Sequence, residues 1–141
     1  MIQPINIPRE QFPKSDVKSE GMITLNISCD NRDVKCFTDI EYINRDGISL
    51  SIQLILPSDR NENTPLVIYV PGSAFRWQNV KGVIPSACLL ANRGFAVAMV
   101  QYRGSEVASF PAQMLDVKAA VRFMKLNAHK YRLNPDNVYL M

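Results

Sequence analysis

Apolar and polar residues alternate over two neighbouring segments, residues 38–43 and 48–56, which flank the polar run Asn44-Arg45-Asp46-Gly47. Alternation on both sides of such a run is typical of a β-hairpin. A weaker alternation over residues 22–28 predicts a short strand within an N-terminal arm of residues 1–37, and the polar residues 57–65 predict a surface loop. The pattern therefore places the start of the folded domain at residue 38.

From residue 66 the pattern changes to continuous apolar runs separated by segments with helical spacing. The runs at 66–70, 95–100 and 138–141 are typical of strands buried on both faces of a parallel sheet. The segment 83–91 predicts a helix, with Pro85 near its start and Gly94 just past its end. The chain is thus predicted to have an α/β fold with parallel strands and right-handed crossovers.

The clearest predicted helix begins near residue 109. Ser109 is expected to cap it, and Pro111 to lie in its first turn. Lys118, Arg122 and Lys125 share one face, which is predicted to be solvated. Apolar residues on another face predict packing against the core: Met114, Val117, Val121, Met124 and Ala128.

The last predicted strand reaches the final residue, Met141, with no polar tail after it. A C-terminus at this point would bury a carboxylate and leave an unpaired sheet edge, and both are unfavourable. We therefore expect residues 38–141 to form an incomplete domain, the first part of a larger α/β enzyme. If the product did end at Met141, its exposed last strand would be expected to pair with a partner or a second copy.

Length, composition and charge limit the classes of function. The chain has 141 residues, of which 47% are hydrophobic and 21% charged, as expected of one soluble domain. The net charge of +3 is small and evenly spread, which argues against nucleic acid or a membrane surface as a partner. No apolar run reaches the roughly 18 residues of a membrane span, and residues 1–20 contain no signal-peptide core. We expect a cytoplasmic protein.

Cysteine and glycine usage gives no sign of a cofactor. Cys29, Cys36 and Cys88 cannot all pair, and with a single histidine they lack the spacing of metal ligands, so free thiols are the preferred interpretation. The turn after the first apolar run reads Pro71-Gly72-Ser73-Ala74-Phe75, which lacks the glycines of a dinucleotide-binding loop. Neither a metal nor a cofactor is predicted, and a nucleotide-binding domain stays as a weaker alternative.

Several segments, in order, resemble the esterase and lipase branch of the α/β-hydrolase superfamily over residues 38–141. Val67-Ile-Tyr-Val-Pro-Gly-Ser-Ala-Phe75 is similar to the strand and oxyanion turn usually written His-Gly-Gly-Gly-Trp. Gln101-Tyr102-Arg103 is similar to the family's Asp-Tyr-Arg. Other segments that resemble the family are Gln53-Leu-Ile-Leu-Pro57, Ala91-Asn-Arg-Gly-Phe-Ala-Val97, Phe110-Pro-Ala-Gln-Met-Leu-Asp-Val117 and Asn134-Pro-Asp-Asn-Val138.

This resemblance implies a serine carboxylic-ester hydrolase that acts on small or short-chain acyl esters through an acyl-enzyme. In this fold the serine lies in Gly-x-Ser-x-Gly after the fifth strand, followed by an acid and then a histidine. No serine of the chain has glycine both two residues before and two residues after it. The catalytic serine, acid and histidine are therefore expected beyond Met141, and the chain alone is predicted to be inactive.

The resemblance also implies that half of an oxyanion hole is present. Ser73 and Ala74 are the expected backbone N–H donors, with Gly72 shaping the turn. Pro71 replaces the family's histidine, and Ser73 and Ala74 replace glycines, so a positive φ at these positions would be strained. Phe75 and Trp77 follow the turn and are expected at the rim of the acyl or alcohol pocket.

Four further residues carry groups that could act in catalysis. Tyr102 and Arg103 are expected at the same edge of the sheet, with Arg103 ordering loops rather than touching substrate. His129 precedes the expected serine and is assigned to the end of a helix, and Asp116 to a first-turn helix charge. The alternative to an enzyme is a non-catalytic remnant that binds a partner through its last strand.

Overall fold

The computed structural model describes residues 8, 11, 20–21, 33–59 and 63–141. The strand predicted over residues 22–28 and Cys29 both lie outside this part of the chain.

Five strands form one mixed sheet in the order β1-β2-β4-β3-β5. They are β1 (Val34–Arg45), β2 (Ile48–Pro57), β3 (Thr64–Tyr69), β4 (Ala96–Val100) and β5 (Leu133–Leu140). Strand β2 runs antiparallel to both β1 and β4, whereas β3 lies between β4 and β5 and runs parallel to both. The predicted α/β fold with a parallel half-sheet is confirmed.

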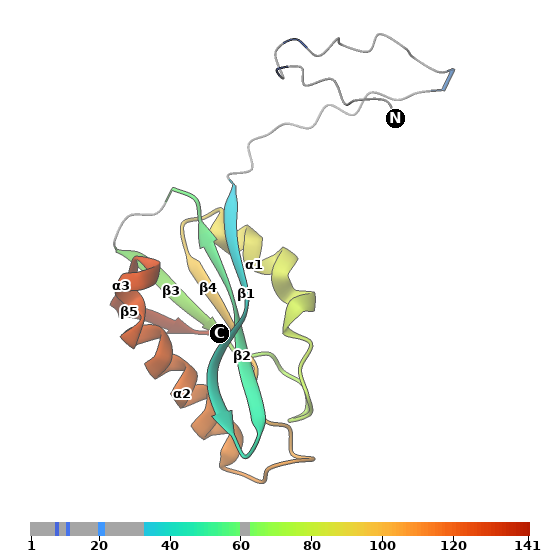
Figure 1. Ribbon diagram of the computed structural model, residues 1–141, viewed down its shortest axis with the longest axis vertical. Helices are drawn as coiled ribbons and strands as arrows, with labels where there is room; N and C mark the ends of the chain where they lie inside the picture. The colour runs from blue at the N-terminus through green and yellow to red at the C-terminus, as the bar shows by residue number, and fades with distance from the viewer. Residues whose placement is uncertain (1–7, 9–10, 12–19, 22–32, 60–62) are drawn as a thin grey trace, which may run out of the picture.

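Helices cover both faces of the sheet (Figure 1). Helix α1 (Ile84–Ala91), preceded by the short 3-10 helix η2 (Val80–Val83), packs on one face, and α2 (Ala112–Leu126) packs on the other. The short helix α3 (Ala128–Tyr131) leads into β5. The sequence of β4 is apolar throughout because both of its faces are covered. Val97 and Met99 pack on the α1 side, and the residues that alternate with them pack on the α2 side.

The predicted hairpin is confirmed, although β1 starts at Val34 rather than at residue 38. Asp46 and Gly47 form its two-residue connection with φ values of 53° and 79°. Positive φ at both positions gives the turn the twist of the flanking strands, which accounts for an Asp-Gly pair at this place.

Helix α2 differs from its prediction in two respects. It begins at Ala112, and neither Ser109 nor the N-cap residue Pro111 provides a side-chain cap, since Ser109 contributes only its carbonyl oxygen, 3.0 Å from the Ala112 nitrogen. Its buried face is also rotated from the predicted apolar stripe, so that Met114 is half exposed. The residues buried on this face are Gln113, Asp116, Ala120 and Met124.

No helix in the described ranges is long and apolar enough to cross a membrane. Because β3, β4 and β5 are parallel, the segments that follow them meet at one edge of the sheet. This carboxyl edge contains the residues singled out in the sequence.

Candidate functional site

The candidate site lies where the chain leaves β3. The Val70 nitrogen donates to the carbonyl oxygen of Met141 at 2.8 Å, and the Met141 nitrogen donates to the carbonyl oxygen of Ile68 at 2.9 Å. The last residue beyond β5 therefore lies directly beside the start of the turn that follows β3. This juxtaposition places any continuation of β5 next to residues 71–76.

Residues 71–76, called the β3 turn below, contain a tight reversal. The Arg76 nitrogen donates to the Ser73 carbonyl oxygen at 3.0 Å, and the two residues between them, Ala74 and Phe75, have φ values of 50° and 59°. Two consecutive positive φ values are typical of a type I′ turn, in which glycine, asparagine and aspartate predominate. Neither residue is of these types, so the turn carries strain on the order of 1–2 kcal/mol per residue.

The backbone N–H groups of Ser73 and Ala74 are the predicted oxyanion donors. Within the described part of the chain, neither N–H group has a hydrogen-bond acceptor. Ala74 is exposed and Ser73 is partly exposed. Gly72 has no positive φ, and a Cβ added to it would meet nothing within 4 Å. The unusual backbone conformation thus falls on Ala74 and Phe75 rather than on the glycine.

Tyr102 and Gln78 connect this turn to the end of β4. The Tyr102 hydroxyl donates to the Pro71 carbonyl oxygen at 2.8 Å and lies 3.0 Å from Ser73 Oγ. The Gln78 side chain accepts from the Tyr102 nitrogen at 2.9 Å and donates to the Arg76 carbonyl oxygen. Tyr102 and Gln78 are 5% and 2% exposed, so this polar network is buried beneath the turn.

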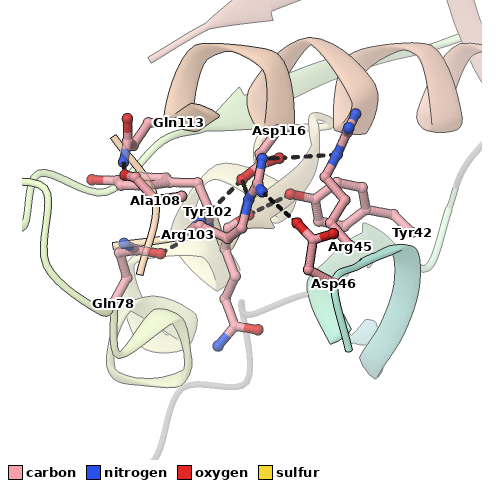
Figure 2. A network of polar contacts seen from close by, with 10 residues as sticks. Tyr42, Arg45, Asp46, Gln78, Tyr102, Arg103, Ala108, Gln113 and Asp116 are labelled. Carbon is pink, nitrogen blue, oxygen red and sulfur yellow. Dashed lines mark hydrogen bonds and ion pairs between the residues drawn. The ribbon is translucent and has the colours of Figure 1, made fainter. Parts of the chain in front are cut away.

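Arg103 and Asp116 form a second buried network that adjoins the first, since Arg103 follows Tyr102 in the chain (Figure 2). The Arg103 guanidinium donates to both carboxylate oxygens of Asp116, at 2.9 and 3.0 Å, and its backbone nitrogen donates to the same carboxylate at 3.1 Å. The hydrogen bond to Asp116 raises the pKa of Arg103. Arg103 makes local hydrogen bonds, as predicted, but its partner Asp116 belongs to helix α2 rather than to a loop.

The assignment of Asp116 to a first-turn helix charge is wrong, because α2 has no acidic residue in its first turn and the Asp116 side chain, later in the helix, is fully buried. Arg45, in β1 near the hairpin turn, places Nε 3.3 Å from Asp116 Oδ1 without hydrogen-bond geometry, so this contact is purely electrostatic. Asp46 lies 3.6 Å from Arg103 on the solvent side. Helix α2 is therefore oriented by a buried carboxylate, which explains why its apolar stripe is rotated.

The two residues predicted at the pocket rim differ in their surroundings. Phe75 lines a cavity of about 190 Å³ together with Ser105, Phe110 and Gln113. Trp77 does not line this cavity, and its backbone nitrogen donates to Glu106 at 3.2 Å. Only Phe75 thus borders a small, largely apolar hollow beside the β3 turn.

His129 lies away from this site. It belongs to α3, three residues before Arg132. The Arg132 carbonyl oxygen accepts from the nitrogen of Thr64, the first residue of β3, at 3.4 Å. This is the amino edge of the parallel strands, opposite the β3 turn. In the described ranges, no group of three His, Cys, Asp or Glu side chains could hold a metal ion.

Comparison with known proteins agrees with these features. The BD-FAE family model matches residues 52–141, which is most of the described domain. The chain belongs to the BD-FAE family. The predicted resemblance to esterases of the α/β-hydrolase superfamily is thereby confirmed, and the β3 turn of this BD-FAE member falls inside the matched region. No protein of curated function shows a significant match to the chain.

Solved structures with a similar fold include several esterases. A truncated carbohydrate esterase from gut microbiota is 30% identical, with a TM-score of 0.66 over 80% of this chain and 40% of its own. A bifunctional GH43-CE protein from Bacteroides eggerthii is 32% identical, with a TM-score of 0.65 over 81% of this chain and 16% of its own. A bacterial heroin esterase, 22% identical, has a TM-score of 0.64 over 82% of this chain and 36% of its own. The chain thus spans less than half the length of these proteins.

Gln78 was missed in the sequence, where it has no recognisable motif. Its role depends on two loops that only the sheet brings together. The only feature of the sequence that points to Gln78 is its position a few residues after the turn. Many residues that face solvent have a similar position.

Proposed function

We propose that this chain is the N-terminal portion of a serine carboxylic-ester hydrolase acting on small or short-chain acyl esters through an acyl-enzyme. The observation that carries the proposal is the β3 turn, where the N–H groups of Ser73 and Ala74 lack acceptors in the described part of the chain. Membership of an esterase family supports the reaction class. Two free thiols, Cys36 and Cys88, agree with a cytoplasmic location.

In the proposed reaction, a serine oxygen attacks the ester carbonyl, and the carbonyl oxygen becomes an oxyanion. The N–H groups of Ser73 and Ala74 donate hydrogen bonds to that oxyanion, and each such donor contributes about 3–4 kcal/mol to the transition state. The alcohol then leaves, and water hydrolyses the acyl-enzyme through a second oxyanion held by the same donors.

The serine is proposed to follow Met141 in a Gly-x-Ser-x-Gly turn, with the acid and histidine later in the chain. The hydrogen bonds of Met141 to Ile68 and Val70 support this placement, because a continuation of β5 emerges beside the donors. The cavity beside Phe75 has a volume of about 190 Å³, which suits a small acyl or alcohol group.

The test is hydrolysis of p-nitrophenyl acetate by the protein at the length made in its source, compared with residues 1–141 alone. We expect turnover by the former, abolished by substitution of the serine in Gly-x-Ser-x-Gly, and none by the latter. Turnover by residues 1–141 alone would contradict the proposal, as would an inactive source protein.

A second candidate is partner binding through β5, without catalysis. Tyr139, Leu140 and Met141 are 51%, 68% and 58% exposed, and β5 pairs only with β3 among the described strands. An unpaired strand edge with apolar side chains favours pairing with another chain. This role would apply to the 141-residue chain on its own.

A further inference from the structure

We propose that Gln78 and Tyr102 are positioning residues that hold the β3 turn in its donor conformation, a role that rests on the proposed function. Together with Ser73 they form what we call the turn clamp. These side chains hold Ala74 and Phe75 at positive φ values. A glycine-rich turn would adopt the same φ values without strain.

The turn has few buried attachments other than the clamp. Gly72, Ala74, Phe75 and Arg76 are exposed, so apolar packing does little to fix their backbone. Positive φ at non-glycine residues persists only where surrounding structure determines it. Hydrogen bonds to the turn therefore supply the restraint. Tyr102 and Gln78 bond to it on both sides of the positive-φ pair, and the Ser105 nitrogen donates to the Phe75 carbonyl oxygen at 2.6 Å.

Gln78 uses both ends of its amide. Its oxygen accepts from the Tyr102 nitrogen at 2.9 Å, while its nitrogen donates to the Arg76 carbonyl oxygen and, at 3.4 Å, to Ser73 Oγ. A carboxylate of the same shape would lack these donors, and an apolar residue would lack both functions. The side chain thus links the loop after β3 to the loop after β4 from a position that is 2% exposed.

The two hydroxyl groups complete the hydrogen bonding of the turn clamp. Tyr102 has one proton, and it donates that proton to the Pro71 carbonyl oxygen at 2.8 Å. Ser73 also has one proton, which it donates to the Arg76 carbonyl oxygen at 2.5 Å, because a carbonyl oxygen can only accept. The Ser73 oxygen in turn accepts from the Gln78 amide at 3.4 Å and lies 3.0 Å from the Tyr102 oxygen, so Ser73 contacts both buried side chains.

These contacts give Ser73 a role that glycine could not fill. Where the esterase pattern has glycine, the serine side chain ties the middle of the turn to two buried groups. The hydrogen bonds of the turn clamp thus hold a backbone conformation that glycine residues would adopt freely.

The test compares Tyr102→Phe and Gln78→Met with Tyr42→Phe in the protein at its source length. Tyr42 is the matched control because its buried hydroxyl donates to the Gln101 carbonyl oxygen at 2.6 Å and does not touch the β3 turn. Backbone ¹⁵N order parameters of Ser73 and Ala74 report the turn itself, and kcat and KM for p-nitrophenyl acetate report its consequence.

We expect both clamp variants to lower the order parameters from about 0.85 to below about 0.6. We also expect kcat to fall at least about tenfold with little change in KM, since the donors act on the transition state. Order parameters equal to those of Tyr42→Phe would overturn the clamp. If the unaltered protein has no hydrolytic activity, the proposed function fails, while the order parameters still decide the clamp.

Discussion

Asp116 is the most deeply buried charge on the helix that supports the candidate site. Its carboxylate receives the Arg103 guanidinium in two hydrogen bonds and faces Arg45 Nε at 3.3 Å. Burial of a charge is tolerated only when its partners compensate for lost hydration. Asp116 therefore fixes the packing of α2, and through its bonds to Arg103 it also fixes the start of the loop after β4.

Replacing Asp116 is expected to destabilise the fold severely. Asp116→Ala leaves Arg103 without its hydrogen-bonded counter-charge and with only the exposed Asp46 nearby, and loss of one partner of a buried pair costs about 3–5 kcal/mol of unfolding free energy. Urea denaturation measures this loss. The control is Asp46→Asn, because Asp46 is 90% exposed and lies 3.6 Å from Arg103, so little change is expected. Equal losses for the two variants would show that burial of the pair is unimportant.

Strain in the β3 turn leads to a stabilising substitution. Ala74 has a φ of 50°, a conformation that glycine adopts freely, so Ala74→Gly is expected to raise the unfolding free energy by about 0.5–1 kcal/mol. Ala119→Gly in the middle of α2 should lower it by about 1 kcal/mol. Thermal denaturation measures both. A loss of stability in Ala74→Gly would mean that the turn is unstrained.

Tyr42 leads to a prediction about alkaline pH. Burial, followed by the neighbouring charge of Asp116, raises its pKa well above the usual range. Between the usual tyrosine pKa of about 10 and the higher value in the folded chain, the folded state holds a proton that the unfolded state has lost. Unfolding free energy should therefore be unaffected by this group below that window and fall as the pH rises through it. Urea denaturation at a series of alkaline pH values measures this dependence. The unfolding free energy of Tyr42→Phe should fall less steeply with pH, and an unchanged slope would show that Tyr42 is not its cause.

At the scale of elements, strand β5 has one paired and one unpaired edge among the described strands. The Met141 nitrogen bonds to Ile68 in β3, and its carbonyl oxygen bonds to Val70 just after β3. By the alternation of a strand, the N–H and C=O groups of Tyr139 therefore face β3, and those of Leu140 face outward. Outward N–H and C=O groups beside exposed apolar side chains favour pairing with a second copy.

A proline scan of β5 separates these two edges. For residues 1–141 alone, Leu140→Pro should reduce self-association without affecting the bonds to β3, because proline removes an outward donor. Tyr139→Pro should instead weaken the pairing with β3 and destabilise the fold. Analytical ultracentrifugation and urea denaturation measure the two effects. Association that is unaffected by Leu140→Pro would exclude this edge as the contact.

Helices and strands could be predicted from the sequence wherever burial alone determines which residues they contain. Strands β3 and β4 are apolar throughout because helices cover both their faces, and Gly94 ends the segment after α1 with a φ of 91°. The rotation of α2 could not be predicted in the same way. It depends on Asp116 meeting Arg45 and Arg103, and the sequence does not show that the hairpin and the loop after β4 come together there.

At the scale of the whole molecule, three parallel strands bring the β3 turn, the loop after β4 and the end of β5 to one sheet edge (Figure 1). The position of this edge was predictable from the strand and helix pattern. The turn clamp was not, because Gln78 acts through two loops separated in sequence by α1 and β4.

The most direct measurement is the intact mass of the protein from its source, before and after reaction with a serine-directed fluorophosphonate. We predict a mass well above 15.9 kDa and the addition of a single adduct, since the proposed serine lies beyond Met141. A mass of 15.9 kDa with no adduct would contradict a serine hydrolase and would leave partner binding through β5 as the function.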